Sequence, residues 1–447
     1  MEAKKLPMAK VLKFAIPSLL GAALFLIPMK INGKFVLGVS ILCDIIQGWM
    51  NPFVDMLALI LLGTSAIVPI LTKIFKPGII MNRKTMRSLF DVSYVIIAVR
   101  AVGFAYLVCY LFKVGPEFIW SDTTGGEAYN IVSTILTLMV GTSLLISLLT
   151  DFGIMDYAGI LVRRFMRPLF TLPGRASLDC IASWVGSSLT GALLTSTQYK
   201  DGYYTKREAC VIMTCFSTAA FSFIFILTRV CGLEAYFLPS VLTIYAAVIP
   251  CAILLPRVYP LSKQKDEYSK EQPKIREEIP QGMSKSRWAL QCAVEKADEM
   301  TVKKFLIKGV QTIASVWFDV LPMVMFVAAT GMIVNEYTPV FRIVTMPFVP
   351  LLNLMGFAEA EVAAPMLLTG FLDQFLPVAM AGAITAIDTR FFVFCMAIAQ
   401  IIYLSEIGVM MIRSKLDFNL GKIFLVFLER TLLSMPIIWI LTRLLIH

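Results

Sequence analysis

Long apolar runs separated by short polar loops dominate this chain. Nine of the runs are long enough to cross a bilayer, because about 20 apolar residues in an α-helix span its hydrocarbon core. The nine predicted spans are 11–29, 54–73, 91–113, 131–152, 208–228, 237–256, 308–333, 388–412 and 421–445. In lipid only helices and closed barrels satisfy their own backbone, so the pattern predicts an all-α polytopic membrane protein.

Two further stretches, 178–204 and 360–387, are apolar but interrupted by glycine, proline and polar residues. Such interruptions are typical of re-entrant hairpins, which enter the membrane and return to the same side. The residues that permit a break are Gly186, Gly191, Pro365, Gly370, Pro377 and Gly382. The alternative interpretation is that the small residues only allow tight helix packing.

The basic residues predict the orientation of the spans, because cytoplasmic loops are enriched in Lys and Arg. Four lysines before or at the start of the first span, Lys4, Lys5, Lys10 and Lys13, predict a cytoplasmic N-terminus, whereas the acidic loop at 114–130 is expected outside. Four arginines between positions 163 and 175 precede the first interrupted stretch, and Glu336, Glu359 and Glu361 precede the second. The two interrupted stretches are therefore expected to enter the membrane from opposite sides.

An internal repeat agrees with these opposite orientations. Pro168-Leu169, Leu172, Gly174, Ala176 and Ala182 recur 182 residues later as Pro350-Leu351, Leu354, Gly356, Ala358 and Ala364. After a slip of two residues, Gly186 matches Gly370 and Thr205 matches Thr389. Three predicted spans separate the copies, and an odd number of spans inverts the second copy relative to the first.

The repeat divides the chain into four regions. They are an N-terminal transmembrane scaffold (1–130), a first repeat with hairpin 178–204 (131–256), a polar cytoplasmic linker (257–304) and a second repeat with hairpin 360–387 (305–447).

Composition narrows the class of protein further. The chain is 58% hydrophobic and 16% charged, whereas an ordinary soluble domain carries about 25% charged residues. Its single histidine is His447, its nine cysteines form no CxxC pair, and it has no phosphate-binding glycine loop. We therefore expect no enzymatic activity, no catalytic residues, no metal site and no cofactor. The net charge of +10 follows from loops that flank the spans and does not indicate nucleic acid.

Two segments carry a resemblance to known membrane proteins. The run Phe14-Ala15-Ile16-Pro17-Ser18-Leu19-Leu20-Gly21, followed by Leu24-Phe25-Leu26-Ile27-Pro28 and Asn32-Gly33-Lys34, resembles the YjiH-type bacterial membrane proteins. The hairpin-plus-span unit, at 131–230 and again at 308–412, resembles the Gate or nucleoside-recognition domain. That domain also occurs in concentrative nucleoside transporters, the FeoB iron permease and spore maturation proteins.

This resemblance implies a bacterial inner-membrane transporter or permease with two inverted Gate-like repeats. Nucleoside carriers place an acidic Gln-Thr-Glu motif on their first hairpin. The corresponding tract of this chain is Thr195-Ser196-Thr197-Gln198, which has no acidic residue.

A polar solute is expected to bind where the interrupted helices meet, because broken helix ends expose partially charged N–H and C=O groups. The candidate substrate-binding residues are Ser187, Ser188, Thr190, Thr197, Gln198, Asp373, Gln374, Gln400, Ser405 and Glu406. Asp373 and Glu406 are predicted to bind the coupling ion or a cationic part of the solute, since a mid-membrane carboxylate costs about 2.5–3.5 kcal/mol on insertion scales. Alternatively, each carboxylate pairs with a buried cation and has no transport role. Gln400 and Glu406 share a helix face only if the helix unwinds between them.

Other intramembrane charges favour structural roles. Arg100 and Asp319 lie near the middle of two predicted spans and are expected to form an ion pair; alternatively, Arg100 receives an anionic substrate. Asp44, Gln47, Asn51 and Asp55 recur at three- and four-residue spacing, which predicts an interfacial or vestibule-lining segment and favours a packing role over a binding one.

The sequence therefore predicts secondary transport of a small polar solute by alternating access, driven by H⁺ or Na⁺. The solute is nucleoside-like, amino-acid-like or a related metabolite. The alternatives are a non-transporting assembly or maturation factor and a metal-ion permease. The expected partners are the lipid bilayer of the bacterial inner membrane and the solute, without nucleic acid; homo-oligomerisation stays open.

Overall fold

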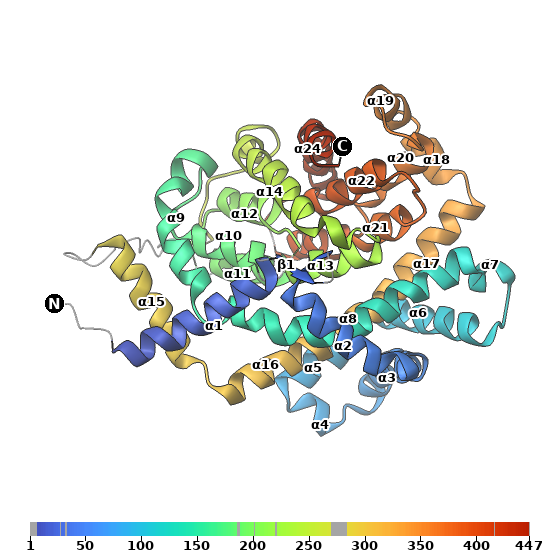
Figure 1. Ribbon diagram of the computed structural model, residues 1–447, viewed down its shortest axis with the longest axis horizontal. Helices are drawn as coiled ribbons and strands as arrows, with labels where there is room; N and C mark the ends of the chain where they lie inside the picture. Colours follow the sequence, from blue (N-terminus) through green and yellow to red (C-terminus); the bar gives the residue numbers. More distant parts are fainter. Residues whose placement is uncertain are drawn as a thin grey trace.

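A computed structural model of the chain is nearly all helical (Figure 1). It describes residues 7–26, 28–31, 34–185, 188–200, 202–219, 221–269, 284–414 and 416–446. One short antiparallel hairpin, β1 (Pro28–Ile31) with β2 (Lys34–Leu37), departs from the all-α prediction and pairs Pro28 with Leu37. The predicted helical membrane fold is otherwise confirmed, except for two of the nine predicted spans.

The helices before the first hairpin cover the N-terminal scaffold and the start of the first repeat. They are α1 (Met8–Leu26), α2 (Gly38–Met50), α3 (Val54–Phe75), α4 (Gly78–Met81), α5 (Lys84–Phe90), α6 (Tyr94–Phe112), α7 (Glu117–Trp120), α8 (Glu127–Thr150) and α9 (Ile154–Phe170), with the 3₁₀ turn η1 (Asn51–Phe53) and the π-helical turn η2 (Asp122–Gly126). The first repeat continues as α10 (Ala176–Val185), α11 (Ser188–Lys200), α12 (Lys206–Cys215), α13 (Phe221–Val230) and α14 (Phe237–Leu254), with 3₁₀ turns η3 (Glu234–Tyr236), η4 (Leu255–Arg257) and η5 (Leu261–Lys263).

The second half of the chain has a similar order of elements. They are α15 (Lys285–Glu299), α16 (Val302–Ser315), the π-helical η6 (Val316–Val320), α17 (Leu321–Tyr337), α18 (Val340–Thr345), α19 (Phe348–Leu354), α20 (Ala360–Thr369), α21 (Phe375–Ala381), α22 (Ile387–Ala399), the π-helical η7 (Leu404–Gly408), α23 (Val409–Arg413) and α24 (Leu420–Leu445). Helix α15 lies within the predicted linker 257–304, so part of that polar stretch is ordered structure.

Among the described residues, seven helical stretches are long and apolar enough to cross a membrane. They are Met8–Phe25, Ile41–Phe75, Tyr94–Phe112, Glu117–Leu145, Glu234–Lys263, Val302–Tyr337 and Leu420–Leu445. Each corresponds to one of the nine predicted spans. The molecule is therefore a multi-pass membrane protein.

The other two predicted spans, 208–228 and 388–412, are wrong as continuous helices. The first is divided into α12 and α13 around residues 216–219, and the second into α22, η7 and α23 around residues 400–403. Neither break contains glycine or proline, so the local sequence gives no sign of it. Directly after the second break, Leu404 donates its backbone N–H to Phe371 O, which is remote in the sequence.

Each interrupted stretch forms two helices that pack against each other, as the hairpin prediction requires. Hairpin 1 consists of α10 packed against α11, and hairpin 2 of α20 packed against α21. Gly370 and Gly382 end the two helices of hairpin 2, whereas Pro365 and Pro377 lie inside them. Gly191 lies inside α11, and Gly186 falls outside the described residues.

The two copies share one register. An offset of 184 residues carries α10 onto α20 and the last residue of α12, Cys215, onto the last residue of α22, Ala399. The offset of 182 predicted for Ala176 and Ala182 is therefore wrong by two residues, because Ala176 and Ala360 begin equivalent helices.

The backbone turns at the two breaks also correspond at this offset. In each break a backbone N–H donates to the carbonyl two residues earlier, Thr218 to Phe216 at 2.9 Å and Ile402 to Gln400 at 2.6 Å. Ile401 adopts φ +61°, a left-handed conformation that is rare for a β-branched residue. Strain of this kind is kept only where the surrounding structure imposes it, which is a hallmark of functional segments.

The start of α1 is tied to α15 at one end of the molecule (Figure 1). Lys10 Nζ lies 2.5 Å from Asp298 Oδ2, and Lys13 Nζ donates to the backbone carbonyl of Asp298 at 2.8 Å. The start of α1 and helix α15 of the linker therefore lie on the same face, as the cytoplasmic prediction for both regions requires. Which side of the membrane this face occupies stays a prediction.

This contact predicts an acid-sensitive attachment of α1. The hydrogen bond from the Lys10 ammonium, with its charge, holds the pKa of Asp298 below its ordinary value. The contribution to stability is fully present above the ordinary carboxyl pKa of about 4 and is lost as the pH falls through the lowered value. We expect the melting temperature of Asp298→Asn to fall less than that of the unaltered protein between pH 6 and pH 3. Asp266→Asn, at an exposed carboxylate, is the control and should follow the unaltered protein; an identical pH profile for Asp298→Asn would contradict the prediction.

Candidate functional site

Each hairpin contacts the broken helix of the other copy. Helix α11 of hairpin 1 packs against η7, and α21 of hairpin 2 packs against α13. The rings of Phe223 and Phe375 meet edge to face across the second contact, with centroids 5.1 Å apart. Leu404, the first residue of η7, donates its backbone N–H to Phe371 O at the tip of hairpin 2, at 2.7 Å. Segment η7 therefore joins both hairpins, which is where the candidate residues were expected to meet.

The tip of hairpin 2 buries Asp373 and Gln374, which are 7% and 4% exposed. Asp373 Oδ1 accepts the backbone N–H of Phe375 at 2.7 Å. An acidic side chain in this position caps the first turn of α21 and satisfies one of its free N–H groups. Asp373 thus has a structural role at the hairpin tip, and its role in binding an ion or solute stays a proposal.

Gln400 links hairpin 2 to α24 at the second break. It is fully buried, and its Nε2 donates to Leu367 O at 2.7 Å and to Thr431 Oγ1 at 3.0 Å. Its Oε1 has no hydrogen-bond partner among the described residues. The α-helix ends directly after Gln400, and residues 401–403 are not helical. The unwinding that would let Gln400 and Glu406 share one face is therefore present.

Gly370 allows this close approach between hairpin 2 and the break. A Cβ at position 370 would lie 2.1 Å from Gln400 Oε1, a distance that no real contact permits. Gln400 cannot simply swing away, because its amide nitrogen is held by two acceptors.

We therefore expect Gly370→Ala to destabilise the protein by about 1–3 kcal/mol, as overpacking of a filled interior does. The measurement is the apparent free energy of unfolding in mixed micelles. Gly382→Ala is the matched control, because Gly382 ends the neighbouring helix with a similar φ of −56° and a Cβ there would meet only Ala379 O at 3.3 Å. Equal effects at the two positions would show that contact with Gln400 is not the cause.

Six of the candidate binding residues have side chains outside the described part of the structure. Ser187 falls outside the described residues, and so do the side chains of Ser188, Thr190, Thr197, Ser405 and Glu406. Their backbone positions are known: Ser188, Thr190 and Thr197 lie on α11, and Ser405 and Glu406 lie on η7. Since α11 packs against η7, the structure brings these two groups of residues together as elements.

Gln198 belongs to a separate network at the base of hairpin 1. Its Nε2 donates to Asp179 Oδ1 at 3.0 Å, and Tyr204 donates its hydroxyl to Asp179 Oδ2 at 2.6 Å. Asp179 is 2% exposed and lies on α10. We had not singled out Asp179 from the sequence, although a carboxylate inside an apolar hairpin is a sufficient signal. The network connects α10, α11 and the start of α12.

The predicted ion pair between Arg100 and Asp319 is confirmed. Arg100 is fully buried on α6, and its Nη2 lies 2.5 Å from Asp319 Oδ1 on η6, while Nη1 donates to Leu89 O at 2.9 Å. The guanidinium is therefore neutralised by an aspartate of the second repeat. This pairing favours the structural interpretation of Arg100 over the anion-receiving one.

The polar residues of the 35–55 region also have partners within the protein. Asp44 Oδ1 accepts from Arg229 Nη1 at 2.5 Å, and Asp55 Oδ1 accepts the hydroxyl of Tyr129. Helix α2 packs against α8, and these bonds tie the N-terminal scaffold to α13 and α8. The predicted packing role is confirmed for Asp44 and Asp55.

Arg430 is a second buried arginine, and the sequence reasoning missed it. It lies near the middle of α24 and is fully buried. Its Nε donates to Ala399 O at 2.5 Å, whereas Nη1 and Nη2 have no hydrogen-bond partner among the described residues. Its place inside the predicted span 421–445 was the signal that could have revealed it.

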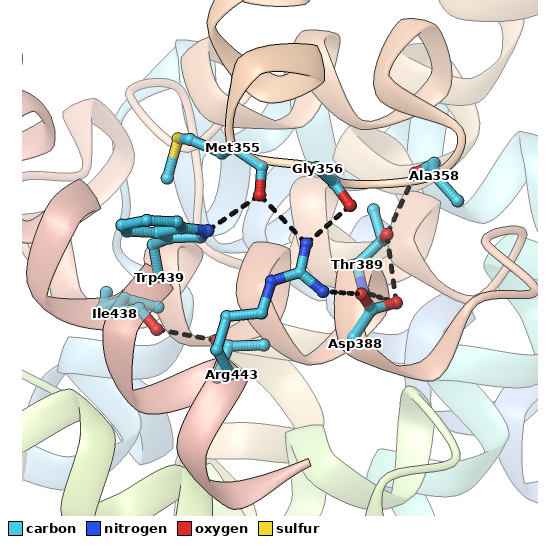
Figure 2. A network of polar contacts seen from close by, with 9 residues as sticks. Met355, Gly356, Ala358, Asp388, Thr389, Ile438, Trp439 and Arg443 are labelled. Carbon is cyan, nitrogen blue, oxygen red and sulfur yellow. Dashed lines mark hydrogen bonds and ion pairs between the residues drawn. The ribbon is translucent and has the colours of Figure 1, made fainter. Parts of the chain in front are cut away.

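A polar network fixes the base of hairpin 2 (Figure 2). Arg443 Nη1 lies 2.9 Å from Asp388 Oδ2, and Arg443 Nη2 donates to the carbonyls of Met355 at 3.0 Å and Gly356 at 2.5 Å. Thr389, the repeat equivalent of Thr205, donates its hydroxyl to Ala358 O at 3.0 Å. The ends of α19, α22 and α24 are thereby held together, so hairpin 2 rests on a fixed base.

Comparisons with known proteins agree with this architecture. Residues 132–234 match the Gate family, which is described as nucleoside recognition. The matched region runs from α8 through hairpin 1 and the first broken helix, so the expected Gate domain is confirmed for the first copy.

A curated relative covers nearly the whole chain. The uncharacterized protein BpOF4_10220 of Alkalihalophilus pseudofirmus is 41% identical over 430 residues, which are 96% of this chain and 93% of the relative. Among solved structures, CNTnw in an inward-facing substrate-bound state has a TM-score of 0.44 and 16% identity, covering 91% of this chain and 99% of that one. A CNTnw variant in an outward-facing state has a TM-score of 0.42 and 14% identity, covering 98% and 100%.

The fold and the matched domain together define a class: a multi-pass helical membrane protein with a Gate nucleoside-recognition domain. Within that class, the chain belongs to the same family as the Alkalihalophilus pseudofirmus protein BpOF4_10220.

Proposed function

We propose that the protein is a secondary transporter that moves a small polar solute across the bacterial inner membrane by alternating access. The observation that carries this proposal is that the hairpin of each copy packs against the broken helix of the other copy. Helix α11 contacts η7, and α21 contacts α13. In this arrangement neither hairpin can move without its contact to the opposite copy changing. A solute held between the copies would therefore be coupled to that movement.

The helix breaks supply the chemistry of binding. A continuous helix uses all its interior backbone groups, whereas α12 and α22 end inside the molecule, at Cys215 and Ala399. The carbonyl ends carry partial negative charge and can replace part of the hydration shell of an ion or solute. The predicted binding residues Asp373, Gln374 and Gln400 lie beside the second break, with Ser405 and Glu406 following on η7.

The Gate domain favours nucleosides and bases as the first solutes to test. H⁺ or Na⁺ is proposed as the coupling ion, with Asp373 and Glu406 as the groups that bind it. Neutral hydroxyls on α11 would complete the hydrogen bonding to the solute.

Uptake into proteoliposomes tests the proposal. The purified protein is reconstituted and offered radiolabelled nucleosides, bases, amino acids, dipeptides and amines, with an inward Na⁺ gradient, an inward H⁺ gradient or neither. We expect at least one solute to accumulate only under a gradient. The same solute at 100 times its Kd should stabilise the folded protein by about 2.7 kcal/mol. Failure of every solute to accumulate, in vesicles that contain folded protein, would contradict the proposal and leave an assembly factor or a metal-ion permease as the explanation.

A further inference from the structure

Arg430 is exceptional among the buried charges of this protein. Arg100, the other fully buried arginine among the largest buried side chains, has an aspartate partner in Asp319. Arg430 has no carboxylate partner within the described residues, and two of its three guanidinium nitrogens donate no hydrogen bond there. A buried charge without a partner is strongly unfavourable, so a structure that keeps one has a use for it.

The position of Arg430 connects it to the second helix break. Its Nε donates to the carbonyl of Ala399, the last residue of α22. The guanidinium therefore lies at the carbonyl end of this half-helix, whose partial negative charge helps to hold it there.

A neutral polar group without a partner among the described residues follows directly after this helix end. Gln400 comes after Ala399 and is fully buried, and its Oε1 has no hydrogen-bond partner in the described part of the chain. Its Nε2 donates to Thr431, the residue after Arg430, at 3.0 Å. Unpartnered buried polar atoms are rare in folded proteins, and here one lies at the same break as Arg430.

The adjacent carboxylate does not neutralise Arg430. Glu429 precedes it on α24, but its Oε2 is also without a hydrogen-bond partner among the described residues. Consecutive residues of a helix point about 100° apart, so the two side chains leave the helix in different directions.

We propose that Arg430 binds the carboxylate of the transported solute through Nη1 and Nη2. The planar guanidinium fork matches a carboxylate and binds it with two parallel hydrogen bonds. A single unpaired cation neutralises one negative charge, which favours a monocarboxylate over a phosphate dianion. The alternative anion site that the sequence suggested, Arg100, is already neutralised by Asp319. Transport of the bound solute rests on the proposed function, whereas binding of its carboxylate to Arg430 does not.

Paired probes that differ only in the carboxylate test the proposal. The purified full-length protein is titrated with acetate against acetamide, pyruvate against pyruvamide and orotate against uracil, in thermal-shift and calorimetric assays at constant ionic strength. We expect at least one carboxylate to raise the melting temperature and its neutral partner to do so at least tenfold less effectively. Arg430→Gln should abolish the preference, and Arg430→Lys should keep part of it.

The controls separate binding from folding. Arg430→Gln removes an unpartnered buried charge, so its melting temperature without solute should not fall by more than that of Arg443→Gln, which breaks an existing ion pair on the same helix. Arg443→Gln should keep the preference for the carboxylate. The proposal is overturned if no carboxylate binds the unaltered protein, or if Arg430→Gln binds it equally well.

The two proposals can fail separately. Uptake of a neutral nucleoside without any carboxylate binding would leave the transport function standing and remove the role of Arg430. Carboxylate binding that depends on Arg430, without uptake of any solute, would leave the anion site standing and remove the transport function.

Discussion

Asp373→Asn combined with Glu406→Gln is expected to lower solute uptake in proteoliposomes at least tenfold. Hydrogen bonds to a charged group contribute about 1.5–3 kcal/mol, and 1.4 kcal/mol corresponds to a factor of ten in an equilibrium constant. Both residues lie on the elements that join the two copies, Asp373 at the tip of hairpin 2 and Glu406 on η7. Loss of both charges should therefore remove the site for the coupling ion.

The choice of asparagine at position 373 separates charge from folding. Asp373 accepts the backbone N–H of Phe375, and asparagine caps a helix nearly as well as aspartate. Glu361→Gln, at an exposed carboxylate in the first turn of the same hairpin, is the matched control and should leave uptake unchanged. Unchanged uptake in the double variant would show that these carboxylates have no part in coupling.

The second large effect is on stability and comes from the buried ion pair between Arg100 on α6 and Asp319 on η6. Asp319→Asn leaves the fully buried Arg100 guanidinium without a counter-charge. Removing one partner of a buried pair typically costs 3–5 kcal/mol. We expect about 3 kcal/mol, because Asp319 itself is 40% exposed. The measurement is the apparent free energy of unfolding in mixed micelles.

Two further variants make this prediction specific. Asp122→Asn breaks an exposed pair in which Lys113 Nζ lies 3.7 Å away, and should cost less than about 1 kcal/mol. Replacing Arg100 and Asp319 together by leucine should restore much of the stability that Asp319→Asn loses, because no unpaired charge is left. A double variant as unstable as the single one would contradict the electrostatic explanation.

The fold could be predicted from the sequence where apolar length decides the structure. The seven continuous spans follow from hydropathy alone, and the hairpins follow from their glycine and proline content. The two broken helices could not be predicted in this way. Segments 216–219 and 400–403 contain no glycine or proline, and the remote contact next to the second of them, from Leu404 N–H to Phe371 O, is visible only in three dimensions.

The candidate site could be predicted in part, because polar residues in apolar segments are visible in the sequence. Asp373, Gln374 and Gln400 were recognised as polar residues in apolar segments, and the structure brings the hairpin tip and the break together. Gln198 was chosen for the same reason but bonds to Asp179 instead. Arg430 shows the limit of this reasoning, because its importance depends on the absence of a partner among the described residues, which only three-dimensional structure reveals.

The insertion of the two hairpins from opposite sides of the membrane is the claim on which the transport proposal depends. Single cysteines placed at the bases of the hairpins, Lys200→Cys at the end of α11 and Ala383→Cys after α21, report it directly, because both positions are exposed. The background carries serine at Cys109 and Cys292, since the other cysteines are buried.

A membrane-impermeant maleimide is then applied to intact cells and to inverted membrane vesicles. A chain that retains Cys292, in the predicted cytoplasmic linker, reports the sidedness of each preparation. We predict that Ala383→Cys is labelled in intact cells and Lys200→Cys only in inverted vesicles. Labelling of both cysteines from the same side would show that the hairpins enter the membrane together, and would contradict an inverted-repeat transporter.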